Sequence, residues 1–220
     1  ALSVFTGKVA NMRILPGIKS VAHFCMIAVM LLVTSLSWAQ NPEPGSPEQV
    51  VRRFHESLLE AMRDGSRLGY RGRFELLAPA VERSHDLDFI ARSTLGSHWA
   101  KLEPEQQRMF TATFRQLSIS SYAGWFKSHE GERFEFVEQQ SMPREQVLVR
   151  SQLVQAKGEV VRFDYVLRQT KDGWRIINIL ADGVSDLALK RVEYRAVLER
   201  DGFPALLDML KKKIVQSEQN

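Results

Sequence analysis

Three consecutive segments between residues 132 and 170 alternate apolar and polar side chains, and this pattern restricts the fold more than any other feature of the chain. In the third segment Val161, Phe163, Tyr165 and Leu167 share one parity, while the other parity is mostly charged. A period of two places successive side chains on opposite faces of a β-strand. The pattern therefore predicts an antiparallel sheet with one apolar face and one hydrated face.

Short turns separate these segments. Lys157-Gly158 stands between the second and the third, and Asp172-Gly173 follows the third. A polar residue followed by glycine is typical of a tight hairpin turn. The next stretch, Trp174 to Ala181, is largely apolar on both parities, which predicts a fourth strand that is central or covered at one end. We expect four antiparallel strands joined in sequence order.

Helical periodicity lies on both sides of this strand region. Ser46 and Pro47 are typical of a helix start, and two short helices are expected to meet near His85-Asp86. A longer helix from about Pro104 carries an aromatic-rich stripe: Phe110, Phe114, Leu117, Ser121 and Trp125. Two more helices, about 184–200 and from 203 onward, flank Asp201-Gly202. The order predicts an α+β fold, a four-stranded antiparallel twisted sheet with helices packed on one face.

Residues 1–39 have the composition of a secretory signal peptide. They contain Lys8, Arg13 and Lys19 and no acidic residue, and an apolar run from Phe24 to Leu36 follows. Ser37 and Ala39 fit a cleavage site after Ala39, and Met12 fits a natural start, which would make 1–11 a prefix. The apolar run is shorter than the roughly 20 residues that span a bilayer. A retained membrane anchor is the alternative.

The remaining chain is expected to be one domain over 46–216, after a linker at 40–45 and before a tail at 217–220. Without the three basic residues of the signal segment, 27 of the 30 basic residues remain against 26 acidic residues. A net charge this close to zero argues against a nucleic-acid-binding protein. The single cysteine, Cys25, lies in the signal segment. We therefore expect no disulfide and no thiolate metal site. The chain is also expected to be a monomer.

Catalytic and metal-binding motifs are not found. The histidines His55, His85, His98 and His129 lack metal-ligand spacing, and neither a phosphate-binding glycine loop nor a nucleophile elbow occurs. The sheet and helices could also form an NTF2-like enzyme cone with Asp164 or Tyr165 transferring a proton in an apolar cavity. Asp164 lies on the hydrated parity, which argues against that alternative. We expect no enzyme activity, no metal and no cofactor.

Three stretches carry a resemblance to a known family. These are "YRGRFELLAPAVERSHDLDFIARSTLG", "EPEQQRMFTATFRQLSISSYAGWF" and "GWRIINILADGVSDLALKRVEYRAVLERDGFPALLDMLK". Together they resemble the MlaC family, the toluene-tolerance auxiliary component of an ABC transporter, over 46–216. The most specific pieces are Trp174 with Asp182-Gly183-Val184-Ser185, and Glu193-Tyr194. "YRGRFELLAPAVE" and "GERFE" are most similar to the hopanoid-associated HpnM branch.

This resemblance implies an MlaC-like fold, in part NTF2-like and cystatin-like. It also implies a periplasmic carrier that passes phospholipid, or a hopanoid, between an outer-membrane complex and an inner-membrane ABC transporter. The lipid chains would lie between the sheet and the helices. The residues then assigned to the pocket are the sheet side chains Val147, Val149, Phe163, Tyr165 and Leu167, the helix side chains Phe110, Phe114, Leu117 and Phe126, and the rim residues Val184 and Leu187.

Alternative interpretations of the same residues stay open at this stage. The apolar stripes also fit an ordinary dry core, because such stripes usually only pack against one another. The cluster Lys211–Lys213 fits either a solvated helix end or a docking patch. An adaptor that binds a membrane complex without carrying lipid is a further possibility.

Overall fold

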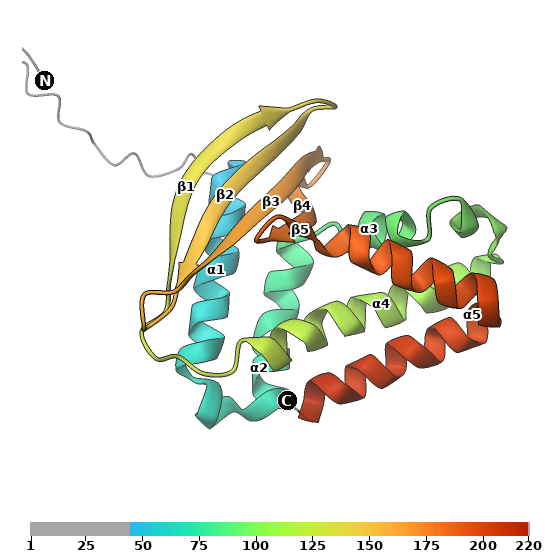
Figure 1. Cartoon of the computed structure of the whole chain (residues 1–220), viewed down its shortest axis with the longest axis horizontal. Coiled ribbons are helices and arrows are strands. Elements are labelled where there is room, and N and C mark those ends of the chain that lie inside the picture. The colour runs from blue at the N-terminus through green and yellow to red at the C-terminus, as the bar shows by residue number, and fades with distance from the viewer. Residues whose placement is uncertain (1–44, 220) are drawn as a thin grey trace, which may run out of the picture. The chain divides into compact units, whose positions relative to one another are not determined.

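The computed structural model describes residues 45–219, in which helices lie on one side of a curved antiparallel sheet (Figure 1). The signal-peptide and linker predictions for residues 1–44 lie outside this range. The helices are α1 (Pro47–Arg63), α2 (Gly65–Ser84), α3 (Leu87–Leu95), the 3₁₀ helix η1 (Gly96–Lys101), α4 (Pro104–Trp125) and α5 (Asp186–Gln219). The strands are β1 (Arg133–Met142), β2 (Gln146–Val154), β3 (Val160–Thr170), β4 (Gly173–Ala181) and β5 (Val184–Ser185).

The sheet follows the predicted meander, in the order β1-β2-β3-β4-β5. Val149 on β2 lies opposite Tyr165 on β3, and Tyr165 lies opposite Ile179 on β4, so the predicted apolar parity does form one face. The α+β class is confirmed. The structure adds a fifth strand to the four that were predicted. Asp182 and Gly183, both with positive φ, form a turn, after which Val184 pairs with Ala181. Two residues are too few to give a periodic signal.

Side-chain caps begin two of the helices, one at the predicted start at Ser46 and one at Asp86, within the predicted His85-Asp86 junction. The Ser46 hydroxyl accepts a hydrogen bond from the Gln49 amide at 3.2 Å, and the Asp86 carboxylate accepts one from the Phe89 amide at 3.0 Å. These bonds satisfy backbone donors that the first helical turn leaves unpaired. The predicted break at Asp201-Gly202 is present as a kink within α5, where Gly202 has a φ of 81°. The kink divides α5 into two arms, which correspond to the two predicted helices. The first arm begins at Asp186, two residues after the predicted start near 184.

The second arm of α5 returns alongside α4 (Figure 1). Gly124 on α4 makes this close approach possible, since a Cβ there would lie 2.8 Å from the carbonyl oxygen of Ser217. The first arm of α5 packs on α3 and reaches β4. The two arms thus extend the helical layer beyond the end of the sheet.

The junction of α2 and α3 covers part of the β4 edge. The Asp86 amide donates to the carbonyl oxygen of Ile176 at 2.9 Å, and His85 pairs with Ile176 as an isolated bridge. Asp86 also accepts two hydrogen bonds from the guanidinium of Arg168 on β3, at 2.6 and 2.9 Å. These contacts hold His85 against the inner face of the sheet. Among residues 45–219, no helix is long and apolar enough to cross a bilayer.

Candidate functional site

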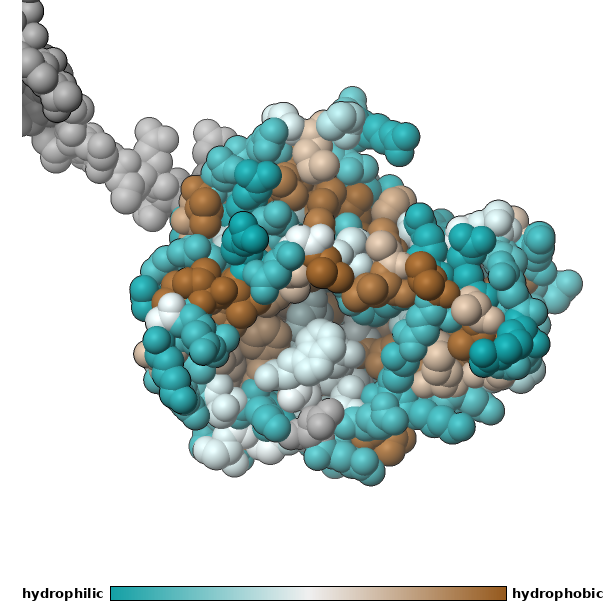
Figure 2. Space-filling model, in the orientation of Figure 1, coloured by the Kyte–Doolittle hydropathy of each residue, from teal (hydrophilic) through white to brown (hydrophobic). Residues whose placement is uncertain are grey.

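A cavity of about 410 Å³ lies between the sheet and the helical layer. Its walls come from β3 and β4 on one side, from α4 on the other, and from the start of α5 at its opening. Figure 2 shows a hollow on this face of the molecule, with hydrophobic side chains gathered along its margins. The described residues therefore enclose a space large enough for a ligand.

The sheet contributes a wall that is almost entirely apolar. Phe163 and Tyr165 on β3 face the cavity together with Ile179 and Ala181, which lie opposite them on β4. A bulge then interrupts β4, because Val166 pairs with Asn178 and Leu167 pairs with Ile176, which leaves the intervening Ile177 without a partner on β3. Both Ile176 and Ile177 consequently line the cavity.

The helix α4 contributes the opposite wall. Phe114, Ser118, Ser121, Tyr122 and Trp125 follow one another at helical spacing along it. The two serine hydroxyls donate to carbonyl oxygens of their own helix, at 2.9 Å for Ser118 and 2.8 Å for Ser121. A guest in the cavity therefore meets hydroxyl groups whose donors are already in use.

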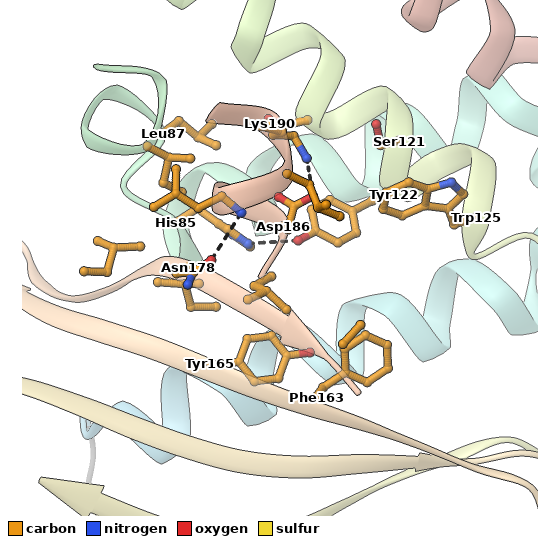
Figure 3. Close-up of a pocket in the computed structure, with 18 of the residues that line it drawn as sticks. His85, Leu87, Ser121, Tyr122, Trp125, Phe163, Tyr165, Asn178, Asp186 and Lys190 are labelled. Atoms are coloured by element: carbon orange, nitrogen blue, oxygen red, sulfur yellow. Dashed lines mark hydrogen bonds and ion pairs between the residues drawn. The ribbon is translucent and has the colours of Figure 1, made fainter. Parts of the chain in front are cut away.

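Two histidine–tyrosine pairs contribute further polar groups to the wall, of which His85, Tyr122 and Tyr165 line the cavity and His55 does not. Nε2 of His85 lies 3.0 Å from the Tyr122 hydroxyl, and Nε2 of His55 lies 2.9 Å from the Tyr165 hydroxyl (Figure 3 shows the first pair and Tyr165). The Ser84 hydroxyl lies 2.7 Å from the Ala80 carbonyl and 2.8 Å from Nδ1 of His85. Because its one proton goes to that carbonyl, Ser84 accepts from Nδ1. Nε2 of His85 then accepts from Tyr122.

The cavity wall keeps these groups uncharged. Burial lowers the pKa of His55 to about 3, aided by the charge of Arg52, and burial lowers the pKa of His85 to about 4. Burial raises the pKa of the Tyr165 phenol, and burial, with the nearby Tyr165 and Asp186, raises the pKa of the Tyr122 phenol. At neutral pH all four side chains are neutral. They satisfy one another in pairs, so the interior presents no unpaired charge to an apolar guest.

Charged groups stand only at the opening. The Lys190 ammonium forms an ion pair with Asp186, and both residues line the cavity where α5 begins (Figure 3). The side-chain oxygen Oδ1 of Asn178 accepts from the Ser185 hydroxyl at 3.1 Å and from the Leu187 amide at 3.3 Å, which fixes this end of the helix. Trp125, Val184 and Leu189 are exposed around the opening, Trp125 by 64%. An apolar rim that carries one ammonium–carboxylate pair is suited to an amphipathic guest.

The chain is similar to known proteins both in its sequence and in its fold. The sequence profile of the MlaC protein family matches residues 52–212. The chain belongs to the MlaC family. Its fold is similar to that of a phospholipid-binding protein from Ralstonia solanacearum, whose structure was determined in complex with a phospholipid. The two share 21% identity and superpose with a TM-score of 0.69, covering 78% of this chain and 98% of the other.

In this MlaC-family chain the predicted pocket residues separate into two groups. Those that line the cavity are Phe114, Phe126, Phe163, Tyr165, Val184 and Leu187. The others are buried in the core and do not line it: Phe110, Leu117, Val147, Val149 and Leu167. Both groups lie on the same face of the sheet and on the same stripe of α4. A residue lines the cavity or packs in the core according to its position along the strand or helix. The helix α1 packs on β1, β2 and β4 and covers part of that face.

Sequence reasoning missed several lining residues of the MlaC-family cavity. Tyr122 lies one position away from Ser121 in the predicted α4 stripe, and His85 had been assigned only to a helix junction. Ser121 and Trp125 belonged to the stripe but were not named as pocket residues. The apolar character of β4 on both parities was the one signal for the contribution of Ile176 and Ile177.

The remaining candidate groups lie elsewhere. Asp164, considered for an enzyme, does not line the cavity, and its carboxylate lies 3.9 Å from Nε of Arg150. His98 pairs with Glu199 at 2.8 Å, and His129 contacts the carbonyl of Glu132 at 3.0 Å. Within residues 45–219 no three histidine, cysteine or acidic side chains gather in a way that could hold a metal ion.

Proposed function

We propose that this protein is a phospholipid carrier that encloses the hydrocarbon chains of its cargo in the cavity between β3, β4 and α4. The observation that carries the proposal is the cavity itself, which has an apolar, internally satisfied wall and a single lysine at its opening. The bound phospholipid in the similar Ralstonia protein supports the same class of cargo.

The physical need for such a cavity follows from the cost of exposing hydrocarbon to water. Each methylene group costs about 0.8 kcal/mol, so an unprotected sixteen-carbon chain costs on the order of 12 kcal/mol. A carrier lowers this cost by surrounding the chain with side chains such as Phe163, Ile179 and Leu187. The head group needs no such protection and stays near Lys190 and Asp186 at the opening.

The polar groups of the cavity wall are better suited to a lipid carrier than to an enzyme. In the wall, the Tyr165 and Tyr122 hydroxyls each have a histidine partner within 3.0 Å, and burial keeps those histidines neutral. A general acid or base needs a pKa near the working pH. The raised tyrosine pKa values and the lowered histidine pKa values both lie far from neutrality, so these pairs act as structural parts of the wall.

We further propose that the carrier works in the periplasm, between an outer-membrane complex and an inner-membrane ABC transporter. The signal-like composition of residues 1–39 and membership of the MlaC family support this placement. A carrier in that compartment crosses an aqueous gap, which is where enclosure of the chains matters.

The resemblance to the HpnM branch motivates a second cargo, a hopanoid or another polycyclic lipid. A fused-ring body would be favoured by the same apolar wall, because hydrophobic burial depends on area and not on chemical type. Phospholipid remains the first proposal, since the Lys190 ammonium at the opening complements a phosphate group.

Lipid analysis of the purified protein tests the proposal. The chain, expressed with its leader and purified without detergent, is extracted with solvent, and the lipids are quantified by mass spectrometry. The proposal expects phospholipid in stoichiometric amounts. Recovery of a polycyclic lipid instead would support the second cargo, and recovery of no lipid would contradict carriage of either.

A further inference from the structure

A second concave site lies on α1, α2 and the β3–β4 turn, apart from the opening of the lipid cavity. This cleft has a volume of about 460 Å³ and is lined by three arginines, Arg53, Arg83 and Arg175, which come from three different elements. Val50, Phe54, Ala80 and Trp174 supply its apolar lining, and the first three of these lie on the two helices. The cleft combines an apolar floor with a basic rim.

The arginines of this rim have no acidic partner within residues 45–219. Other arginines of the described chain do have one, as Arg168 has with Asp86 and Arg115 with Glu82 and Asp88. By contrast, the side chains of Arg53 and Arg83 form no hydrogen bond or ion pair within residues 45–219. Arg175 donates only to the Trp174 carbonyl, at 3.0 Å. Their guanidinium groups retain most of their donors for a ligand.

Two carboxylates, Glu56 and Asp172, also line the cleft, and neither forms an ion pair with these arginines. Three arginines against two carboxylates leave the lining with a net charge of +1, and the guanidinium groups stay available to an anionic ligand.

We propose that this cleft binds an acidic polypeptide segment of a partner protein, with carboxylates on the three arginines and an apolar side chain on the floor. The planar fork of arginine matches a carboxylate with two parallel hydrogen bonds. A protruding segment enters a concave site, whereas the flat surface of a bilayer does not reach its floor. The apolar floor distinguishes the ligand from a free inorganic anion.

The cleft and the lipid cavity share a thin wall. Ser84 lines the cleft, its hydroxyl lies 2.8 Å from Nδ1 of His85, and His85 lines the cavity beside Tyr122. Phe54, on the cleft floor, contacts both rings edge-on, with centroids 4.9 Å from His85 and 5.1 Å from Tyr122. A partner segment seated in the cleft would lie one layer of side chains from the lipid.

Fluorescence anisotropy with a fluorescein-labelled peptide of alternating glutamate and leucine tests the proposal. The triple variant Arg53→Gln/Arg83→Gln/Arg175→Gln is compared with Arg63→Gln/Arg144→Gln/Arg162→Gln. The second triple removes the same charge from arginines that also lack acidic partners but lie outside the cleft. We expect the cleft variant to bind at least about tenfold more weakly and the control variant less than about threefold more weakly. Circular dichroism checks that both triple variants fold. If either triple variant does not fold, the single variants Arg53→Gln and Arg83→Gln, both at exposed positions, are compared with the parent chain instead.

Two further arms separate the ligand classes. Inorganic phosphate, and vesicles of phosphatidylglycerol, are tested against the same variants. Equal weakening of peptide binding in both triple variants would overturn the proposal. The proposal would also be overturned if phosphate bound with the affinity of the peptide and lost that affinity in the cleft variant to the same extent. Vesicle binding that depends on the cleft, without peptide binding, would assign the site to a membrane surface and overturn it as well.

Discussion

Tyr122 and His85 face each other across the wall of the lipid cavity, with the phenol oxygen 3.0 Å from Nε2 of the imidazole. The hydrogen bonds of Ser84 make this nitrogen the acceptor and Tyr122 the donor. The pair joins α4 to the α2–α3 junction, and that junction is bonded to the edge of β4 through the Asp86 amide. Two hydrogen bonds, joined through the His85-Asp86 backbone, thus connect the helical wall of the cavity to its sheet wall.

Removing the Tyr122 hydroxyl is expected to destabilise the protein. In Tyr122→Phe the buried Nε2 of His85 loses its donor, which costs about 1–3 kcal/mol in the free energy of unfolding. Urea denaturation measures this change. Tyr194→Phe is the matched control, because Tyr194 is buried and its hydroxyl forms no hydrogen bond in the described part of the chain. A loss in Tyr194→Phe as large as in Tyr122→Phe would contradict the assignment.

Filling the cavity is expected to exclude lipid without unfolding the chain. Ser121 lines the cavity on α4, so the indole of Ser121→Trp would occupy the space of an acyl chain. We expect lipid occupancy, measured by mass spectrometry of solvent extracts, to fall several-fold while the helical circular dichroism signal is kept. Ser128→Trp adds the same side chain at an exposed position that does not line the cavity. Equal occupancy in the two variants would mean that lipid binds elsewhere.

Lys190 at the opening is expected to recognise the phosphate of the cargo. Lys190→Met should weaken binding of a phospholipid about three- to tenfold, the loss of one charge-assisted contact near the surface, and leave binding of diacylglycerol unchanged. Competition with a fluorescent lipid gives both affinities. Lys212→Met removes an exposed lysine that does not line the cavity. If diacylglycerol binding falls to the same extent, Lys190 contributes packing rather than phosphate recognition.

Acid is expected to destabilise the fold through the two buried histidines. Their pKa values, about 3 for His55 and about 4 for His85, lie below the value of 6.5 expected in the unfolded chain. The unfolded state therefore binds protons that the folded state does not. The free energy of unfolding should be independent of these groups above pH 6.5 and fall as the pH drops from 6.5 toward 4, by up to about 1.4 kcal/mol per pH unit for each histidine.

Urea denaturation at a series of pH values checks this slope. We expect the double variant His55→Phe/His85→Phe to be less stable at neutral pH but to lose much of its pH dependence between 6.5 and 4. His129→Gln, at an exposed histidine, should keep the slope of the parent chain. A slope unchanged in the double variant would show that other groups cause the acid sensitivity.

The sheet and its apolar face could be predicted because their signals are local. The alternation through Phe163, Tyr165 and Leu167 and the turns at Gly158 and Gly173 need only a few neighbouring residues to be recognised. The break at Gly202 and the cap at Asp86 are local in the same way. The two-residue strand β5 was missed because its pairing depends on the turn at Asp182 and Gly183 and not on any periodicity.

The division of that face into core and cavity could not be predicted. Val149 and Phe163 belong to the same apolar parity, yet Val149 is fully buried and Phe163 lines the cavity. What separates them is the packing of α1, which is far away in the sequence. The bulge at Ile177 could not be predicted either, because the sequence of an apolar strand does not indicate where its register shifts. The arginine cleft likewise depends on long-range packing of α1, α2 and β4.

The central claim is that acyl chains lie between β3, β4 and α4, and a crystal structure of the protein purified with its native lipid tests it most directly. The account predicts continuous electron density for hydrocarbon beside Tyr122, Phe163 and Ile179, with the head group at the Lys190 end of the cavity. A structure in which lipid lies outside this cavity, or in which these side chains close over an empty space while lipid remains bound elsewhere, would contradict it.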